Sequence, residues 1–396
     1  MARIIAHIDL NAFFVTCEVL TNPSLKGKPL IVGHTGRSGI VSTCSYEARE
    51  KGVHSGQPTF QALKCCPEAI VIEPHFRLYE VYSRSFFSYV KSYAKDIEVA
   101  SVDECFADMT DVLSKQKDPV AFLRAMQFDL YKQTGLTCSI GVAPTKWLAK
   151  MASDMKKPMG LVFLRRRDLE KVLYPLPIES FWGIGKKTAP RLREQGINTI
   201  GDLHRRILED EPTMQKEFGK FFHTVKEWIE GRGSDVIQTE PDDPKSIGVS
   251  HTLSFDRTGF HEVDKTLHDL CLEVQRRAEK EGKVGRGVTL HVKDTAFKGH
   301  SKTTSFDEPT RDAERLYAAV SRLYQASYED LEVRLVGVTL EKIGDMAHQE
   351  VQMSLWNYEQ YEEMDQTKLL IAELNRKLEK PTLIRASQAK KKGGGK

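Results

Sequence analysis

The sequence predicts a multidomain α/β protein, and three observations support this prediction. The chain has 396 residues, which is too long for a single ordinary hydrophobic core. We therefore expect two to four compact units. Short β-branched runs typical of strands alternate with segments of helical spacing in both halves of the chain. Between the halves, residues 232–244 contain GSD and PDDP and lack apolar periodicity, which indicates a linker.

The first half is predicted to hold an open α/β sheet with carboxylates at strand ends. The apolar run at residues 4–8 ends at Asp9, as expected of a buried strand that delivers an acid to a sheet edge. A glycine-broken, irregular α/β region is expected at residues 27–56. We expect further strands at 97–100 and 137–142, and helices at 11–20, 80–94 and 120–133.

A boundary is expected at Pro175 and Pro177, followed by a mostly helical region to about Gly231. Beyond the linker, alternating apolar residues at 288–292 and 336–340 predict strands of a second α/β unit. After Gly344 the chain turns polar and ends in KKKGGGK, which is typical of a disordered tail.

The composition is that of a soluble globular protein. Hydrophobic residues make up 40% and charged residues 29% of the chain. No run approaches the ~18 apolar residues that span a bilayer, so we expect no membrane partner. Seven cysteines lie scattered without a CxxC pair, and we therefore expect reduced thiols in a cytoplasmic protein.

The net charge of +3 would by itself argue weakly against a nucleic-acid partner. The distribution matters more than the sum. Residues 146–167 hold seven basic side chains against one acid, and residues 283–302 hold five against one. Two basic surfaces are therefore expected.

The acids Asp9, Asp103 and Glu104 are the most informative residues, because each is expected at the end of a strand. Phosphoryl transfer from a nucleoside triphosphate uses two divalent cations roughly 3.5–4 Å apart. Magnesium seeks oxygen ligands, so three carboxylates from adjacent strand ends would suffice to hold it. Taken singly, such acids more often cap helices or face water, and Asp9 alone carries little weight.

Five motifs in fixed order carry a family resemblance: IDLNAFF (8–14), SYEAREKGVHSG (45–56), SVDECFAD (101–108), SIGVAPTKWLAKMASDMKKPMG (139–160) and WGIGKKTAPRL (182–192). Over about residues 3–340 the chain resembles the Y-family DNA polymerases, and within them the DinB, or polymerase IV, branch. The resemblance implies a right hand with an added DNA-gripping domain. Its expected parts are the palm (1–10 and 75–165), the fingers (11–74), a helical thumb with a helix-hairpin-helix (166–231), the linker (232–244), the little finger (245–343) and a tail (344–396).

By this resemblance, Asp9, Asp103 and Glu104 are catalytic and hold two Mg²⁺ ions together with the main-chain carbonyl of Leu10. Glu104 would lie nearest the primer 3′ hydroxyl. The chain departs from the family at Asn11, where many relatives carry a second acid. An outer role of that position toward the metal is therefore in doubt.

The resemblance also implies the nucleotide site. Tyr46 and Arg49 are three residues apart and hence share one helix face, from which both can reach a triphosphate. The family places Phe13, Thr43, Tyr46, Arg49 and Lys157 on the incoming deoxynucleoside triphosphate, Phe14 as the steric gate that excludes a 2′ hydroxyl, and small residues such as Ser42 and Gly56 around the templating base. Read without the family, paired aromatics such as Phe13 and Phe14 are usually core, and Arg49 is an ordinary exposed helix residue.

Primer-template DNA is the implied partner of two regions. Glycines at a helix start let the backbone approach a phosphate, which gives Gly183, Gly185 and Lys186 a role in the helix-hairpin-helix. In the little finger, Lys293, Lys298, Lys302 and Arg334 are expected to form one basic sheet face along the duplex, with contacts to phosphates rather than bases.

Residues 351–356 read VQMSLW and are similar to the sliding-clamp peptide Gln-x-Ser-Leu-Phe of bacterial polymerases. Gln352, Leu355 and Trp356 would bind the clamp, with Trp356 in place of Phe. The alternative is a hydrophobic strip that packs on its own domain.

The resulting hypothesis is a monomeric, magnesium-dependent, low-fidelity DNA polymerase that copies damaged templates. Two alternatives belong to other classes. A non-catalytic DNA- and clamp-binding scaffold would be favoured by loss of a metal carboxylate, yet all three are present. A nucleotidyl cyclase would share a palm-like sheet with paired acids, but it would need neither a helix-hairpin-helix nor a clamp peptide.

Overall fold

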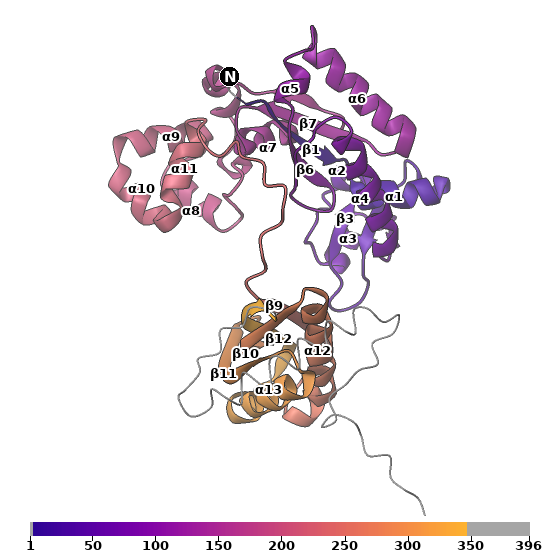
Figure 1. Ribbon diagram of the computed structural model, residues 1–396, viewed down its shortest axis with the longest axis vertical. Helices are drawn as coiled ribbons and strands as arrows, with labels where there is room; N and C mark the ends of the chain where they lie inside the picture. Colours follow the sequence, from indigo (N-terminus) through magenta and orange to yellow (C-terminus); the bar gives the residue numbers. More distant parts are fainter. Residues whose placement is uncertain (1–2, 347–396) are drawn as a thin grey trace, which may run out of the picture. The chain divides into compact units, whose positions relative to one another are not determined.

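The computed structural model describes residues 3–346. The chain forms two compact units, one ending at Asp243 and one beginning at Pro244 (Figure 1). This division falls at the end of the predicted linker, and both units are mixed α/β, as the sequence predicts. Within the described residues, no helix combines the length and the apolar character that crossing a membrane requires.

A five-stranded sheet in the order β5-β6-β1-β7-β8 organises the first unit. The strands are β1 (Ile5–Leu10), β5 (Ile97–Val99), β6 (Glu104–Asp108), β7 (Cys138–Ala143) and β8 (Leu161–Phe163). The only parallel pair in this sheet is β7 with β8, whereas β1 runs antiparallel to both of its neighbours. Every residue of β1 is buried, which agrees with its continuous apolar run.

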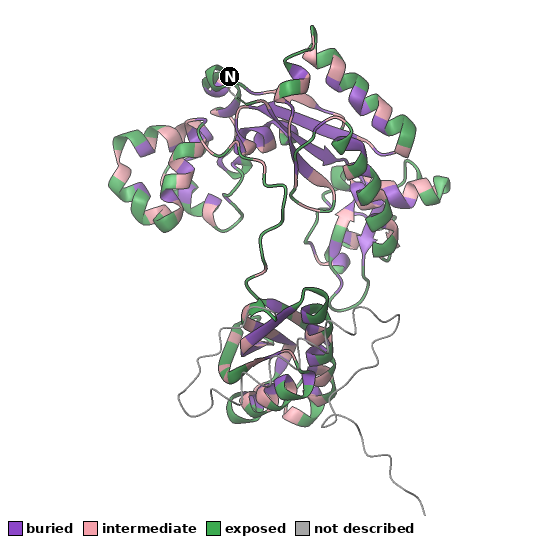
Figure 2. Cartoon of the chain, in the orientation of Figure 1, coloured by how far each residue is buried: buried purple, intermediate pink, exposed green. Residues whose placement is uncertain are grey.

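Alternate residues of β1 face two different layers. Ala6, Ile8 and Leu10 pack in a core with the helices α1 (Phe13–Thr21), α4 (Phe76–Lys91) and α6 (Pro119–Thr134). His7 and Asp9 project from the opposite face, which α7 (Lys146–Met155) covers. Figure 2 shows the strands buried at the centre of this unit and the helices exposed on their outer sides.

Gly141 allows α7 to lie directly on the sheet. A Cβ atom at this position would stand 2.1 Å from the carbonyl oxygen of Ala149 and 2.3 Å from the amide nitrogen of Ser153. No side chain fits there, because real Cβ atoms never come so close to a backbone. The helix backbone therefore rests on β7, and its side chains reach β1 and β6.

A small three-stranded sheet in the order β3-β2-β4 forms a subdomain beside α1. It comprises β2 (Leu30–Gly33), β3 (Val41–Cys44), β4 (Ile70–Ile72) and the helices α2 (Tyr46–Glu50) and α3 (Thr59–Cys65). Ser45 caps α2 by accepting a hydrogen bond from the Ala48 amide. The cap fixes the start of this short helix, which carries two of the predicted nucleotide-binding residues.

The helical region after β8 contains α8 (Thr188–Glu194), α9 (Ile200–Glu209), α10 (Glu211–Phe218) and α11 (Phe222–Ile229), with short 3-10 and π turns before α8 and one 3-10 turn between α10 and α11. It shares a core with α7 through Trp147, which stacks on Trp228 at 5.7 Å between ring centroids. The Trp147 indole also donates a hydrogen bond to the carbonyl oxygen of Trp182.

The predicted linker has no helix or strand, but its first part is not free. Ser234 accepts a hydrogen bond from the Lys146 amide, and the Gln238 amide donates to the carboxylate of Glu98. Lys146 also forms an ion pair with Glu98 at 2.8 Å. These contacts fasten residues 234–238 to α7 and β5, which composition alone does not predict.

The second unit is an antiparallel sheet in the order β11-β10-β12-β9. It comprises β9 (Ile247–Arg257), β10 (Lys283–Asp294), β11 (Gly299–Thr310) and β12 (Val333–Asp345), with α12 (Phe260–Lys280) and α13 (Ala313–Tyr328). Both helices pack in one core with Val288, Leu290 and Val292 of β10, the face that the alternation predicts.

The four predicted basic residues of this sheet do not share one face. Lys302 lies opposite Leu290, and opposite residues of an antiparallel pair project to the same side, so Lys302 is on the helix-covered face. Lys293 is three residues after Leu290 on the same strand, so it points to the opposite face of the sheet. Lys298 lies in the turn between β10 and β11. Arg334 stacks its guanidinium over the Phe297 ring at 4.7 Å. The expectation of one face was wrong because it ignored strand register.

Candidate active site

A cavity of about 360 Å³ lies in the first unit, where the end of β1 meets α1, α2 and the turn before β6. Its lining brings together segments that are far apart in the sequence. The lining residues are Asp9, Leu10, Asn11, Ala12, Phe13, Phe14, Ser42, Thr43, Tyr46, Arg49, Ser55, Val102, Asp103 and Lys157. All predicted nucleotide-binding residues are among them. Of the small residues expected around the templating base, Ser42 lines the cavity, whereas Gly56 does not and its neighbour Ser55 does.

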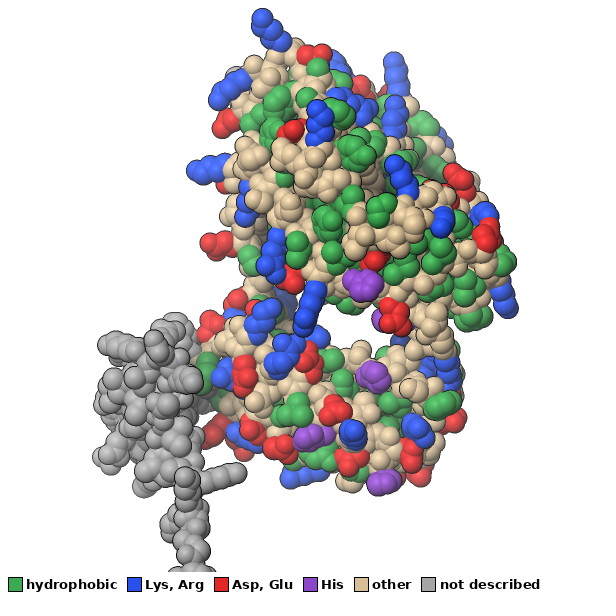
Figure 3. All heavy atoms as spheres, turned by 90° about the vertical axis from the view of Figure 1, so that its right-hand side faces the viewer, with side chains coloured by type: hydrophobic (Ala, Val, Ile, Leu, Met, Phe, Trp, Pro, Cys, Tyr) green, Lys and Arg blue, Asp and Glu red, His purple; other side chains and the backbone are tan. Residues whose placement is uncertain are grey.

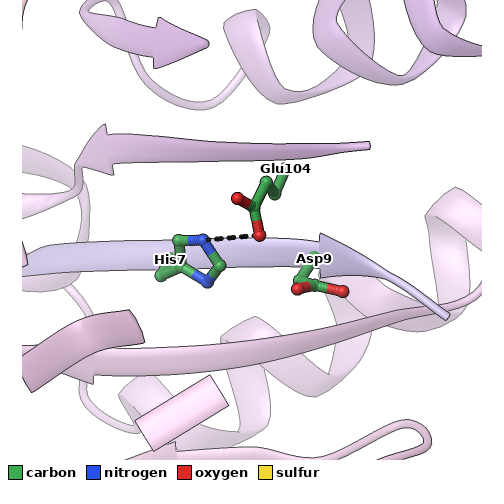
Figure 4. A group of neighbouring side chains, drawn as sticks. All are labelled: His7, Asp9 and Glu104. Atoms are coloured by element: carbon green, nitrogen blue, oxygen red, sulfur yellow. Dashed lines mark ion pairs between the residues drawn. The ribbon is translucent and has the colours of Figure 1, made fainter. Parts of the chain in front are cut away.

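The predicted metal ligands meet through strand register. Asp9 on β1 lies directly opposite Glu104 on β6, so both carboxylates project from the same face of the sheet (Figure 4). Asp103 precedes β6, and its carbonyl oxygen accepts a hydrogen bond from the Leu10 amide at 3.0 Å. The hairpin between β5 and β6 thus carries two acids to the end of β1.

The environment shifts the pKa values of Asp103 and Glu104 in opposite directions. Burial, followed by repulsion from Asp9 and Glu104, raises the pKa of Asp103 above its ordinary value. Contact with the His7 imidazole and the Lys150 ammonium holds the pKa of Glu104 well below its usual range, although burial opposes them. The repulsion felt by Asp103 is of the kind that a bound cation relieves.

His7 is a buried neighbour that sequence reasoning missed. Its Nδ1 forms a hydrogen bond with Ser153 Oγ at 2.8 Å. Its Nε2 stands 3.4 Å from Glu104 Oε2 and has no hydrogen-bond partner among residues 3–346 (Figure 4). The signal was present in the sequence, because His7 and Asp9 are two apart on one strand and must share a face.

Two lysines hold the acids from the side of α7. Lys150 Nζ lies 2.7 Å from Glu104 Oε2 and 3.2 Å from Asp9 Oδ2. Lys157 Nζ lies 2.8 Å from Asp9 and 2.8 Å from Asp154. Sequence reasoning predicted Lys157 but counted Lys150 only as part of a basic surface. Lys150 and Asp154 are one helical turn apart, a spacing that indicates a shared face.

The donor set suits a hard divalent cation. Ligand atoms of His7, Asp9 and Glu104 all lie within 4.8 Å of one another, and Asp103 is close enough to feel both carboxylates. Carboxylate and carbonyl oxygens are the ligands that Mg²⁺ prefers, whereas imidazole is not, so the acids and not His7 fit that ion.

Tyr46 and Arg49 present two donors at the cavity wall. The Arg49 guanidinium lies over the Tyr46 ring, 4.8 Å from its centroid, and its Nε donates to the Cys44 carbonyl. The Tyr46 hydroxyl is buried and has no well-formed hydrogen bond to any described residue. Burial is also the main cause that raises the pKa of Tyr46. An unpaired buried donor at a cavity fits an acceptor on a ligand.

Phe14 is held rigidly at the cavity wall. Its ring stacks on Tyr79 at 4.1 Å and 12°, and Phe76 meets it edge-on. The Tyr79 hydroxyl donates to the buried carboxylate of Glu18 at 2.5 Å. Phe13 is 3% exposed and packs in the core, so the two adjacent aromatics have different environments.

Asn11 ties the end of β1 to the loop that carries Lys157. Its side-chain amide donates to Ser139 Oγ and accepts from the Met159 amide, both at 2.9 Å. The residue is buried, and Ala12 beside it adopts a left-handed backbone with φ 43°. The position where the chain departs from the family that it resembles thus joins three backbone segments around the cavity.

The predicted DNA contacts lie elsewhere. Gly183 has φ 113° and faces Phe221 and Trp228, while Gly185 faces open space and Lys186 follows it in the turn before α8. On the face shown in Figure 3, Lys and Arg side chains are interspersed with Asp and Glu rather than gathered in one patch. The predicted clamp residues Gln352, Leu355 and Trp356 lie outside the described residues.

Comparison with known families gives three matches in chain order. Residues 8–154 match the impB/mucB/samB family, residues 166–197 match the helix-hairpin-helix (HHH) motif of this IMS family, and residues 244–355 match the C-terminal domain of the impB/mucB/samB family. Together these matches cover most of the chain, including every cavity-lining residue except Lys157.

Similar proteins share nearly the whole length. A protein named DNA polymerase IV from Oceanobacillus iheyensis is 35% identical over 377 residues, which is 95% of this chain and 89% of that protein. DNA polymerase IV 1 from Bacillus subtilis is 32% identical over 99% of this chain and 96% of that protein.

Solved structures agree with the fold. A Y-family DNA polymerase chimera is 28% identical, with a TM-score of 0.75 over 86% of this chain and 99% of that chain. An insertion ternary complex of the DNA polymerase Dbh is 27% identical, with a TM-score of 0.59 over 86% and 99%.

Replacing Asn11 by Ala should lower the free energy of unfolding by about 2 kcal/mol, because the part-buried Met159 amide loses its acceptor and the buried Ser139 hydroxyl loses its donor. The matched control is Asn22→Ala, which removes an exposed amide that accepts only locally from Ser24 and should cost under about 1 kcal/mol. Urea unfolding of both variants measures the difference. Equal losses would mean that Asn11 has no special structural role.

Proposed function

The chain belongs to the impB/mucB/samB family of Y-family DNA polymerases, and we propose that its cavity performs template-directed, low-fidelity DNA synthesis past damaged bases. The observation that carries this proposal is the convergence of Asp9 and Asp103 with Tyr46, Arg49 and Lys157 in one cavity. A scaffold without catalysis finds no support, because all three expected metal carboxylates are present: Asp9 and Asp103 line the cavity, and Glu104 lies opposite Asp9.

Asp9, Asp103, Glu104 and the carbonyl of Leu10 would hold two Mg²⁺ ions. Bound there, the two ions would lower the pKa of the primer hydroxyl and neutralise charge on the leaving pyrophosphate. The protein contributes geometry: the β1–β6 register keeps Asp9 and Glu104 opposite each other, and the hairpin turn adds Asp103. Glu104 is the acid that we assign to the primer 3′ hydroxyl, since it does not line the nucleotide cavity itself.

The incoming triphosphate is gripped from two sides. On α2, Tyr46 offers a single hydroxyl donor and Arg49 a guanidinium that can donate two hydrogen bonds. The Thr43 hydroxyl, on the preceding strand β3, lines the same cavity. Lys157, in the loop after α7, offers a cation next to Asp9. A ligand that carries about four negative charges is thereby matched by donors of different geometry, which fixes its phosphates relative to the acids.

Phe14 is the residue that we assign to sugar selection. Its stacking on Tyr79 prevents the ring from moving aside, so a 2′ hydroxyl would meet a rigid wall. Around the template base, the small side chains Ser42 and Ser55 leave room, with Gly56 next to them. A roomy pocket tests base-pair shape poorly, which explains tolerance of damaged templates.

The remaining parts of the chain fit the right-hand architecture of a polymerase. We assign the five-stranded sheet to the palm, the subdomain around β2 to the fingers, residues 166–231 to the thumb and the second unit to the little finger. The thumb would bind primer-template phosphates through Gly183, Gly185 and Lys186. In the little finger, Lys293, Lys298 and Arg334 remain candidate phosphate contacts, whereas Lys302 belongs to the other face. We expect a monomer that works in the cytoplasm.

Glu104→Ala should abolish primer extension with magnesium and deoxynucleotides, a fall of about a thousandfold or more, because one metal ligand is lost. Asp108→Ala is the matched control, since Asp108 lies at the far end of the same strand. A gel of extended primers measures both, with circular dichroism to verify folding. Full extension by Glu104→Ala would rule out the proposed catalysis.

Phe14→Ala should raise ribonucleotide incorporation relative to deoxyribonucleotide by roughly tenfold or more, since the wall at the sugar is removed. Phe76→Ala controls for the aromatic cluster, because Phe76 touches Phe14 but does not line the cavity. Single-nucleotide insertion kinetics give the ratio. Unchanged sugar discrimination in the Phe14 variant would remove this assignment.

Residues 352–356 are proposed to anchor a sliding clamp. Replacing Leu355 and Trp356 together by Ala should abolish clamp stimulation of synthesis while leaving synthesis without the clamp intact. Primer extension with and without the clamp measures this, with Met353→Ala as the neighbouring control. Undiminished stimulation of the double variant would favour a strip that packs on its own domain.

A further inference from the structure

Lys150 occupies a position that the proposed polymerase function does not explain. Its ammonium lies 2.7 Å from Glu104, 3.2 Å from Asp9 and 3.6 Å from Asp154, and its side chain is only 12% exposed. Unlike Lys157, it does not line the nucleotide cavity. Among residues 3–346, the hydrogen-bond and ion-pair partners of its ammonium are all carboxylates, so it is not placed to grip a triphosphate.

The ammonium faces three carboxylates, those of Asp9, Glu104 and Asp154, all within 3.6 Å. A lysine side chain is ordinarily charged at neutral pH. A buried ammonium that bridges two acids lowers their mutual repulsion. It also places a positive charge where a divalent cation has to approach.

The backbone leaves Lys150 little freedom to withdraw. Thr145 caps the start of α7 by accepting from the Leu148 amide, and Gly141 lets the helix lie against β7. Ser153, one turn later on the same face, is joined to His7. The helix is thereby fastened to β1 and β7 on both sides of Lys150.

We propose that Lys150 is a positioning residue, a built-in counter-charge that keeps Asp9 and Glu104 side by side and at the same time weakens their affinity for a divalent cation. The proposal rests on the metal-dependent function given above. Cation binding would then be strengthened by the added negative charge of the incoming triphosphate. Metal loading is thereby coupled to nucleotide binding.

The test uses the full chain without DNA or nucleotide and Mn²⁺ as the probe, with binding followed by electron paramagnetic resonance. Lys150→Met and Lys150→Gln should each bind Mn²⁺ roughly tenfold more tightly than the unchanged protein, because a nearby positive charge is removed. Both should also melt at a lower temperature without metal and show a larger rise in Tm on adding Mg²⁺. Lys150→Arg, which keeps the charge, should restore the original affinity.

Lys146→Met is the matched control. Lys146 lies one turn earlier on the same helix and forms an equally close pair with Glu98, away from the metal ligands. Its loss should lower Tm without changing Mn²⁺ affinity. If the uncharged Lys150 variants bind Mn²⁺ as Lys146→Met does, or more weakly, the proposal is wrong.

A further variant separates the two proposals. Glu104→Ala should bind Mn²⁺ more weakly than the unchanged protein if the acids form a metal site. Should Glu104→Ala leave Mn²⁺ binding unchanged, the metal-dependent function itself would fail. Weaker binding in Glu104→Ala with unchanged affinity in Lys150→Met and Lys150→Gln would overturn only the role of Lys150.

Discussion

The structure depends on gathering like charges at the end of one buried strand. The antiparallel register of β1 and β6 places Asp9 opposite Glu104, and the turn before β6 adds Asp103. Such a cluster is unfavourable without compensation, since burial and mutual repulsion both penalise ionised carboxylates. Lys150 and Lys157 supply two positive charges in contact with these acids, and His7 contacts Glu104 from the sheet.

Helix α7 converts this cluster into a site. Because Gly141 has no side chain, the helix lies against the sheet, and its Lys150 reaches Asp9 and Glu104. Asn11 then joins β1 to β7 and to the loop bearing Lys157. The nucleotide cavity adjoins the same strand end, where α1 and α2 contribute Phe14, Tyr46 and Arg49. Lys150 compensates charge without lining the cavity, whereas Lys157 both contacts Asp9 and lines the cavity.

Much of the local structure was predictable from periodicity. The first strand and the helices near 11–20 and 120–133 lie within one or two residues of their predicted places, whereas α4 begins at Phe76, four residues before the predicted start. Strand register was not predictable, and this produced the error at Lys302. Composition also could not show that residues 234–238 dock on the sheet, because their hydrogen bonds come from distant backbone.

The sequence alone determined the residue types of the chemistry, the order of the motifs and the family, since these depend on local spacing along one chain. Only the tertiary structure decided which side chains meet. It placed His7 and Lys150 beside Glu104, put Ser55 rather than Gly56 at the cavity, and gave Asn11 its role as a tie. The physical reason is that these contacts join residues about 50 to 150 positions apart, and strand pairing and helix packing create that proximity.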